Sequence, residues 1–193
     1  STKGYAAPSG YKFVNIAAAR VGEGQYDRSY FYYIAQSIEG SPKQIKILKT
    51  NDSFGEPTEL LTYTESAPML MNAHSRIVTT KLNGNAYYDY DNKIYHWAMT
   101  GVDPVVPAEG AKPDITLPDG EQIMDICTNA VPSTSSAVVD DDQLLIATYN
   151  PTATGRKPGS LYVYSLKTME KVKEYVGICE KPVAVAYKFP TSN

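Results

Sequence analysis

Several residue types that carry well-known chemistry are scarce in this chain of 193 residues. It contains two cysteines, two histidines, one tryptophan and four phenylalanines. The cysteines, Cys127 and Cys179, are too few for a disulfide scaffold and too far apart for a zinc knuckle, so the sequence leaves two free thiols and a single disulfide both open. His74 and His96 have no cluster of carboxylates beside them. We therefore expect no metal site and no cofactor.

The chain also lacks a charge excess and a long apolar run. Its 18 Lys and Arg residues and 21 Asp and Glu residues leave a formal net charge of −3. This balance provides no basic surface for nucleic acid or for an anionic membrane. No apolar run approaches the roughly 18 residues of a membrane-spanning helix, and Ser1 does not begin a basic and apolar leader. We expect no nucleic-acid partner and no direct membrane insertion by this segment.

Motifs of common catalytic sites are missing as well. There is no Gly-x-Ser-x-Gly elbow, no phosphate-binding loop and no dinucleotide-binding fingerprint. The acidic runs at residues 89–92 and 140–142 lack the spacing of a calcium loop, and both fall where hairpin ends are expected. We predict no catalytic residue. A pair of carboxylates that converge from distant positions is the enzymatic arrangement that the sequence leaves open.

Tyrosine, in contrast, is abundant, with 16 residues. Its ring packs while its hydroxyl stays near water or a polar partner, which suits twisted β-sheets and also carbohydrate-binding surfaces. The only helical-looking stretch, residues 168–176, suits a strand equally well. Strand patterns are common, as in YFYYIAQ at residues 30–36, KQIKILK at 43–49 and TELLTYT at 58–64. The sequence predicts an all-β fold.

The strand-like segments recur at a nearly constant spacing. First strands of successive units begin near Lys12, Met69, Ile123 and Val183, at separations of 57, 54 and 60 residues. Third strands match too, because QIKIL, KIYHW and SLYVY each follow a turn signal and precede a polar connection. Four antiparallel strands within one repeat are typical of the blades of a β-propeller.

We therefore predict repeats of four-stranded antiparallel sheets that form a partial β-propeller of about three blades plus one strand. A single propeller-like domain at residues 1–193 would hold blades at residues 11–66, 67–121 and 122–181, with residues 182–188 opening a further blade. Propellers close with about four to eight blades, so the remainder of a longer polypeptide or a second chain would complete the ring. A two-sheet β-sandwich, which needs no closure, is the alternative.

The closing unit resembles a known family. It reads QLLIATYNP at residues 143–151, GSLYVYSLKTMEKVKEYVG at 159–177 and PVAVAYK at 182–188, preceded by KIYHW and PDITLPDGEQIMDI. These segments are similar to the C-terminal, propeller-like part of the PKD-like family of Bacteroidetes surface lipoproteins, and the similarity is best from about residue 87 to 188. The resemblance implies an envelope-anchored binding or scaffolding protein, at the cell surface or in the periplasm of a Gram-negative bacterium, near glycan-uptake systems. It supplies no catalytic residue.

Loops on one face of the predicted propeller supply the candidate binding residues. Loops that join second to third strands, and fourth strands to the next blade, share the face around the entrance of the central channel. The richest is NPTATGRKPG at residues 150–159. Solvated loop charge is the alternative explanation, and Trp97 is assigned to packing between blades. The candidate ligand-binding residues are Asn150, Arg156, Lys157, Asp119, Glu121 and Glu180.

These patterns favour a non-catalytic cell-surface binding or scaffold domain with a glycan or protein partner. The alternative is a glycan-processing enzyme with a carboxylate pair near the channel. A third interpretation is a structural module that orients neighbouring domains. It predicts an exposed apolar flank at residues 11–19 or 183–187.

Overall fold

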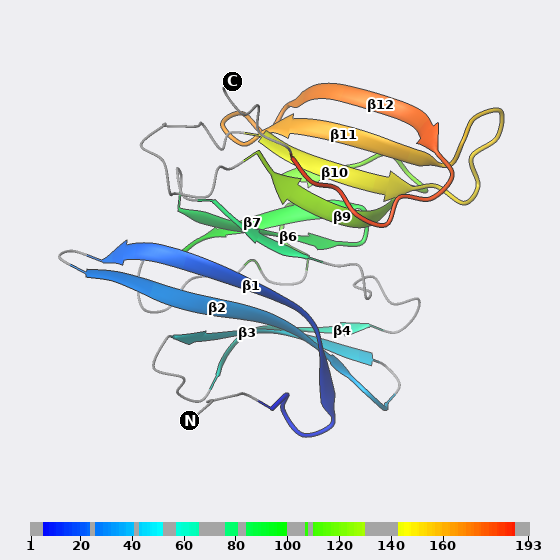
Figure 1. The fold of residues 1–193 in the computed structure, drawn as a ribbon. Helices are drawn as coiled ribbons and strands as arrows, with labels where there is room; N and C mark the ends of the chain where they lie inside the picture. The colour runs from blue at the N-terminus through cyan, green and yellow to red at the C-terminus, as the bar shows by residue number, and fades with distance from the viewer. Residues whose placement is uncertain are drawn as a thin grey trace.

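The protein is built from β-strands alone in the part of the chain that the structure describes. The computed structural model covers twelve strands and no helix, and hence no helix able to cross a membrane, within its described residues. The strands form three four-stranded antiparallel sheets in chain order (Figure 1). The predictions of an all-β fold and of repeated four-stranded sheets are confirmed. The described residues are 6–23, 26–40, 43–51, 57–65, 76–80, 84–99, 107, 110–129 and 143–187.

The first sheet is a meander in which each strand pairs with the next. The first two strands are the longest, and their ladder runs from Tyr11 opposite Ser37 to Glu23 opposite Tyr26. The dense aromatic and β-branched residues of the second strand explain its preference for this pleated, two-sided environment. The strands are β1 (Tyr11–Glu23), β2 (Tyr26–Ser37), β3 (Lys43–Asn51) and β4 (Thr58–Glu65).

The second sheet repeats the meander with shorter strands. Its central hairpin turns at Asp91 and Asn92, and Asp91 adopts a φ of 60°. Aspartate tolerates this left-handed conformation better than a β-branched residue does, which is why the acidic run marks a turn. The strands are β5 (Ile77–Thr79), β6 (Asn85–Tyr90), β7 (Lys93–Ala98) and β8 (Ile115–Thr116).

The third sheet has the order β12-β11-β10-β9 and ends in an exposed edge strand. Its last strand includes residues 171–176 of the stretch that looked helical, so strand formation prevails there. The preceding turn is closed by a hydrogen bond from the Met169 N–H to the Ser165 carbonyl (2.8 Å). The strands are β9 (Gln122–Thr128), β10 (Gln143–Tyr149), β11 (Gly159–Ser165) and β12 (Lys171–Cys179).

Residues 182–188 were expected to open a further blade; residues 182–187 belong to no strand, and Lys188 lies outside the described residues. A strand assignment requires a ladder with a neighbouring backbone, and this segment pairs with none of the described strands. It is nevertheless attached to the third sheet, because the Val185 N–H donates a hydrogen bond to Asp125 Oδ2 (2.8 Å). The opening of a further blade therefore stays a prediction.

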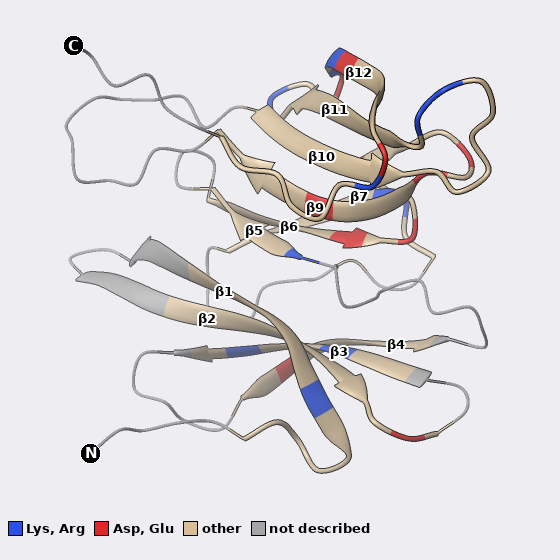
Figure 2. Ribbon diagram, turned by 45° about the vertical axis from the view of Figure 1, so that its right-hand side comes forward, with Lys and Arg blue, Asp and Glu red and all other residues tan. Residues whose placement is uncertain are grey.

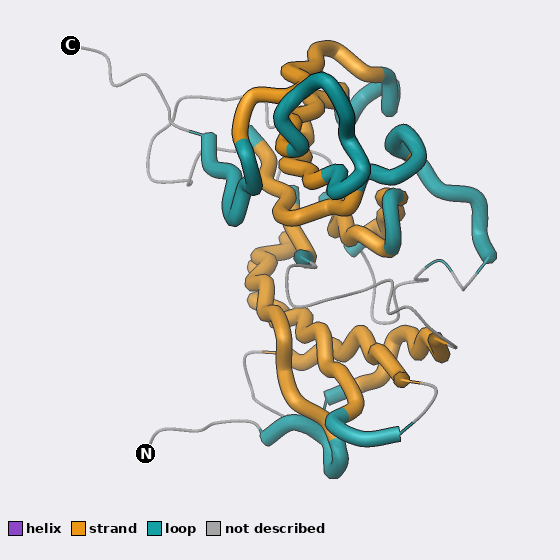
Figure 3. Tube along the Cα trace, turned by 90° about the vertical axis from the view of Figure 1, so that its right-hand side faces the viewer, coloured by secondary structure: helices purple, strands orange, loops and turns teal. Residues whose placement is uncertain are grey.

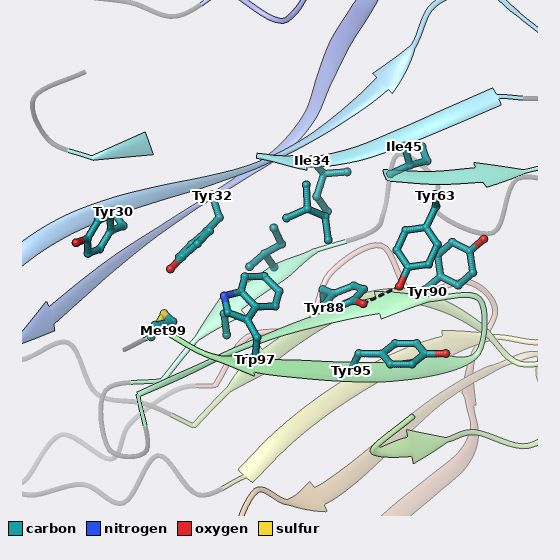
Figure 4. Packing of buried hydrophobic residues seen from close by; sticks show 13 residues of the cluster. Tyr30, Tyr32, Ile34, Ile45, Tyr63, Tyr88, Tyr90, Tyr95, Trp97 and Met99 are labelled. Atoms are coloured by element: carbon teal, nitrogen blue, oxygen red, sulfur yellow. Dashed lines mark hydrogen bonds between the residues drawn. The ribbon is translucent and has the colours of Figure 1, made fainter. Parts of the chain in front are cut away.

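The second sheet lies between the other two (Figures 1 and 3). Its two faces contribute to two cores, one shared with the first sheet and one with the third. Neighbouring residues of a strand point to opposite faces, so Tyr88 joins the cluster shared with the first sheet and Tyr87 joins the one shared with the third. In the first cluster Trp97 packs edge-on against Tyr32 with ring centroids 5.3 Å apart, and the Tyr63 and Tyr88 hydroxyls share a 2.7 Å hydrogen bond (Figure 4).

One polar contact in this core is incomplete. The hydroxyl of Tyr32 and the indole N–H of Trp97 are both buried, and neither meets a hydrogen-bond partner at proper distance and angle. Burial raises the pKa of Tyr32 to about 12, against the smaller opposing effect of the nearby indole N–H. Because Trp97 is buried in this core, it packs between the sheets and its ring has no surface that a ligand could contact.

Candidate functional site

The six candidate binding residues all lie at one end of the third sheet. Asn150 follows β10, Arg156 and Lys157 lie in the loop between β10 and β11, and Glu180 follows β12. Asp119 and Glu121 lie in the turn that enters β9. Charges of both signs are interspersed around this sheet (Figure 2).

The structure pairs most of these residues with one another. Arg156 Nη2 lies 3.0 Å from Glu121 Oε1, and Lys157 Nζ lies 3.8 Å from Glu180 Oε1. Asn150 stands against Gly120, where an added Cβ would come within 3.1 Å of the Asn150 amide nitrogen. We call the six candidate residues together the loop cluster. Asp119 is exposed and makes no hydrogen bond or ion pair with the other five.

Glu121 is the buried centre of the loop cluster, with 3% of its surface exposed. Its carboxylate accepts hydrogen bonds from Thr148 Oγ1 (2.5 Å), Arg156 Nη2 (3.0 Å) and the Tyr162 hydroxyl (3.4 Å). A buried carboxylate is costly unless such partners replace water. The burial of the Tyr162 hydroxyl, followed by the nearby Glu121 charge, raises the pKa of Tyr162 to about 12. Glu121 therefore fixes the loop to the sheet and is closed to a ligand.

Arg156 ties this loop to the edge strand. Its Nη1 donates to Ser160 Oγ (3.1 Å) and to the Lys157 carbonyl (3.3 Å). Ser160 Oγ in turn accepts a hydrogen bond from the Gly177 N–H in β12 (3.2 Å). Gly177 has a φ of 70°, and a Cβ there would meet the Arg156 Cβ at 3.2 Å, so glycine is required for this close approach.

The outer pair of the loop cluster is open to solvent. The side chains of Lys157 and Glu180 are 57% and 78% exposed, and an ion pair of this kind contributes little stability. Beside them the Lys181 ammonium lies over the Tyr149 ring at 5.1 Å from its centroid. Among the six candidates, Lys157, Glu180 and the exposed Asp119 are the ones that a partner can reach.

A second set of polar contacts, which the sequence patterns did not reveal, connects the sheets. Arg76 Nε lies 3.2 Å from Asp125 Oδ1, and the Arg76 N–H donates to Asp89 Oδ1 (2.6 Å). Asn15 Oδ1 accepts a hydrogen bond from the Ile77 N–H (3.3 Å), across the boundary between the first and second sheets. Arg76 and Asp125 belong to different repeats, so their pairing depends on how the sheets stack. The sequence signal that could have identified Asn15 and Asp125 as equivalent residues is the similarity of FVNI at residues 13–16 to IMDI at 123–126.

The histidines and cysteines form no metal site in the described structure. No group of three or more His, Cys, Asp or Glu residues is placed there to hold an ion. His96 Nδ1 lies 2.8 Å from Asp114 Oδ2, which raises the pKa of the imidazole, while His74 lies outside the described residues. Cys127 and Cys179 are free thiols, and burial followed by the Asp125 charge raises the pKa of Cys127 to about 11.

Comparison with known proteins gives no relative: no family model and no curated sequence matches the chain. The similarity to the PKD-like surface lipoproteins therefore stays a hypothesis, together with the location that it implies.

Proposed function

We propose that this protein is a non-catalytic binding or scaffold domain whose partner is another protein. The observation that carries the proposal is the edge strand β12, whose residues are exposed along most of its length. Its large apolar side chains are 40 to 56% exposed. They lie beside a backbone edge that pairs with no other described strand, which is the character of an interaction surface. These side chains are Val172, Tyr175, Val176 and Ile178.

The loop cluster supports binding over catalysis. A glycosidase needs two carboxyl groups that face the substrate from opposite sides of the scissile bond. Glu121, the buried acid of the cluster, instead has both oxygens occupied by internal donors. Glu180 faces solvent at the rim, next to Lys157. This arrangement is suited to holding loops in place and to presenting charge at a surface.

The distribution of tyrosine favours a protein partner over a glycan. Ring stacking on sugars requires exposed aromatic faces. Most of the described tyrosines are instead buried, all but Tyr33 in the cores between the sheets and Tyr33 in a small cluster of first-sheet residues, so the tyrosine excess is explained by packing. The buried ones are Tyr30, Tyr32, Tyr33, Tyr63, Tyr87, Tyr88, Tyr90, Tyr95, Tyr162 and Tyr164.

We also propose that the three sheets form an arc of a β-propeller and not part of a sandwich. In support of this, β5, the first strand of the second sheet, contacts both β1 and β9, the first strands of its neighbours. First strands converge in this way when blades surround a common axis. The cell surface or periplasm of a Gram-negative bacterium belongs to the same proposal and rests on the family resemblance.

Photo-crosslinking from β12 tests the proposed partner class. A benzoylphenylalanine introduced at Tyr175 is expected to form a discrete adduct with a protein in the native host, whereas the same group at the exposed turn residue Lys167 is expected to form none. Affinity electrophoresis through a panel of polysaccharides serves as the second arm. Retardation by a polysaccharide, with no adduct at Tyr175, would overturn the protein partner and establish a glycan ligand.

A further inference from the structure

The segment at residues 183–187 is attached to the third sheet in the same way that β5 is attached to the first. The Ile77 N–H donates to the side-chain oxygen of Asn15 in β1, and the Val185 N–H donates to the side-chain oxygen of Asp125 in β9. Donor and acceptor are separated by 62 residues in the first case and by 60 in the second. This separation matches the period of the repeat.

The two acceptors occupy equivalent positions in their strands. The ladder between β1 and β2 shifts between Phe13 and Asn15, which makes Val14 an extra residue. The ladder between β9 and β10 shifts in the same way, because Asp125 and Ile123 face consecutive residues of β10. A bulge re-aims the side chain beside it. In both strands the re-aimed side chain is the polar residue that holds the next repeat.

If Val185 is equivalent to Ile77, the far edge of residues 183–187 is equivalent to the edge of β5 that pairs with β6. In β5 that edge carries an antiparallel ladder in which Val78 faces Tyr87. Backbone groups of an extended segment alternate between its two sides. Val185 and Tyr187 direct their backbone groups toward β9, where the backbone of Tyr187 forms a hydrogen bond with the Cys127 sulfur. The backbone groups of Ala184 and Ala186 are therefore directed away from the sheet.

This outer edge is open in the described structure. Ala184 and Ala186 are exposed, and their backbone groups make no hydrogen bond to any described residue. Val183 and Tyr187 are 68% and 41% exposed. No residue from 182 to 187 is charged, so nothing on the segment repels an apolar strand.

We propose that residues 183–187 are a docking edge for an antiparallel β-strand of another protein, with apolar and aromatic side chains on both faces. The chemistry of the occupant follows from the strands that fill the equivalent position in each sheet. These are YFYYIA in β2, NAYYDY in β6 and LLIATY in β10. The incoming strand would pair with residues 183–187 as β2, β6 and β10 pair with the first strands of their sheets. Main-chain hydrogen bonds would supply most of its binding affinity. The proposal deepens the proposed binding function and shares its premise that the partner is a protein.

A hairpin peptide of residues 84–98, which contains β6 and β7, is the probe for this edge. Added to the isotopically labelled full chain, it is expected to shift the amide resonances of Ala184 and Ala186. Ala186→Pro removes an N–H from the open edge while keeping an extended backbone, and is expected to weaken binding about tenfold. Ala186→Ser keeps that N–H and is the matched control, expected to bind as the unchanged chain does. Asp125→Ala, which releases the segment, is expected to lose the interaction.

Three results would overturn the docking edge. The peptide can leave residues 183–187 unshifted, it can bind Ala186→Pro as tightly as Ala186→Ser, or the protein alone can sediment as a dimer that Ala186→Pro dissociates. The last result would assign the edge to a second copy of the chain. Crosslinking at Tyr175 tests β12 independently of this edge. If the peptide binds but no adduct forms at Tyr175, only the proposed partner of β12 is contradicted.

Discussion

At the scale of single residues, the charged side chains of the loop cluster divide by burial into two groups with different consequences. Glu121 is enclosed and has three donors, whereas Glu180 is largely exposed and has one distant ammonium. An interaction with a buried charge is expensive to break because the remaining partner is left without water. An exposed pair is replaced by water at little cost.

Glu121→Gln is therefore expected to destabilise the protein by about 1 to 3 kcal/mol, because the Arg156 guanidinium loses its buried counter-charge. Urea unfolding of the variant at pH 7 measures the change. Glu180→Gln is the matched control, with an expected effect within about 0.5 kcal/mol. Equal losses in the two variants would show that Glu121 does not fix the loop.

His96 gives the protein a second residue-scale property, a pH-dependent contact between β7 and Asp114, the residue before β8. The hydrogen bond to Asp114 raises the pKa of His96 above its ordinary value, with desolvation opposing it. A pKa raised on folding means that the protonated imidazole stabilises the native state. This contribution is fully present below pH of about 6.5, the unfolded pKa, and disappears as the pH rises through the folded pKa.

We expect the stability difference between the unchanged chain and Asp114→Asn to be larger at pH 5.5 than at pH 8. Unfolding by urea at both pH values gives the difference directly. The histidine at position 74 is present in both proteins and so cancels if it is unaffected. A difference that is the same at both pH values would contradict a contribution from the His96–Asp114 pair.

At the scale of elements, the sequence predicted strands best where both faces are buried. The run of NAYYDY in β6 is dense in tyrosine because one face packs on the first sheet and the other on the third. Strand β12 was ambiguous, since its apolar residues are exposed and follow neither a helical nor a strict alternating pattern. The assignment of β12 as a strand depends on its pairing with β11, and the register of that ladder shifts at two points. Exposure of an edge depends on what packs beside it, which a local pattern does not contain.

The hairpin of β6 and β7 allows a test of one turn residue. Asp91 has a φ of 60°, a conformation that costs a β-branched residue more than aspartate and costs glycine least. We expect Asp91→Val to destabilise the protein by about 1 kcal/mol or more, and Asp91→Gly to be close to neutral. Thermal unfolding compares the two. Similar melting temperatures for both variants would mean that the turn relaxes to another conformation.

At the scale of the whole molecule, the repeat was visible in the sequence, and the contacts between repeats were not. Recurring first and third strands predicted repeated four-stranded sheets, and the structure has three of them. The first strand of the second unit was expected near Met69, which lies outside the described residues. The loop cluster was also foreseen in part, because the topology brings Arg156 and Glu121 to one end of a sheet. The pairing of Arg76 with Asp125 depends on how sheets stack, which no spacing within one repeat specifies. The burial of Glu121 depends on the side chains of β10, β11 and the loop between them.

The stacking order makes a prediction about cooperativity. The second sheet shares one core with the first and another with the third, so loss of either core exposes residues of the same strands. Trp97, the only tryptophan, lies in the first core, whereas Ile146 lies in the second. If the three sheets form one cooperative unit, Ile146→Ala destabilises the environment of Trp97 as much as it destabilises the third sheet.

Ile146→Ala is expected to cost about 2 to 5 kcal/mol, the range for emptying a buried aliphatic site. Its urea transition, followed by Trp97 fluorescence and by far-ultraviolet circular dichroism, should shift equally for both probes. Val172→Ala on the exposed edge strand is the control, with an expected change of about 0.5 kcal/mol or less. A fluorescence transition that stays in place while the dichroism transition shifts would mean that the third sheet unfolds by itself. In that case the contacts of Arg76 and Ile77 with their neighbours would position the sheets without making them one thermodynamic unit.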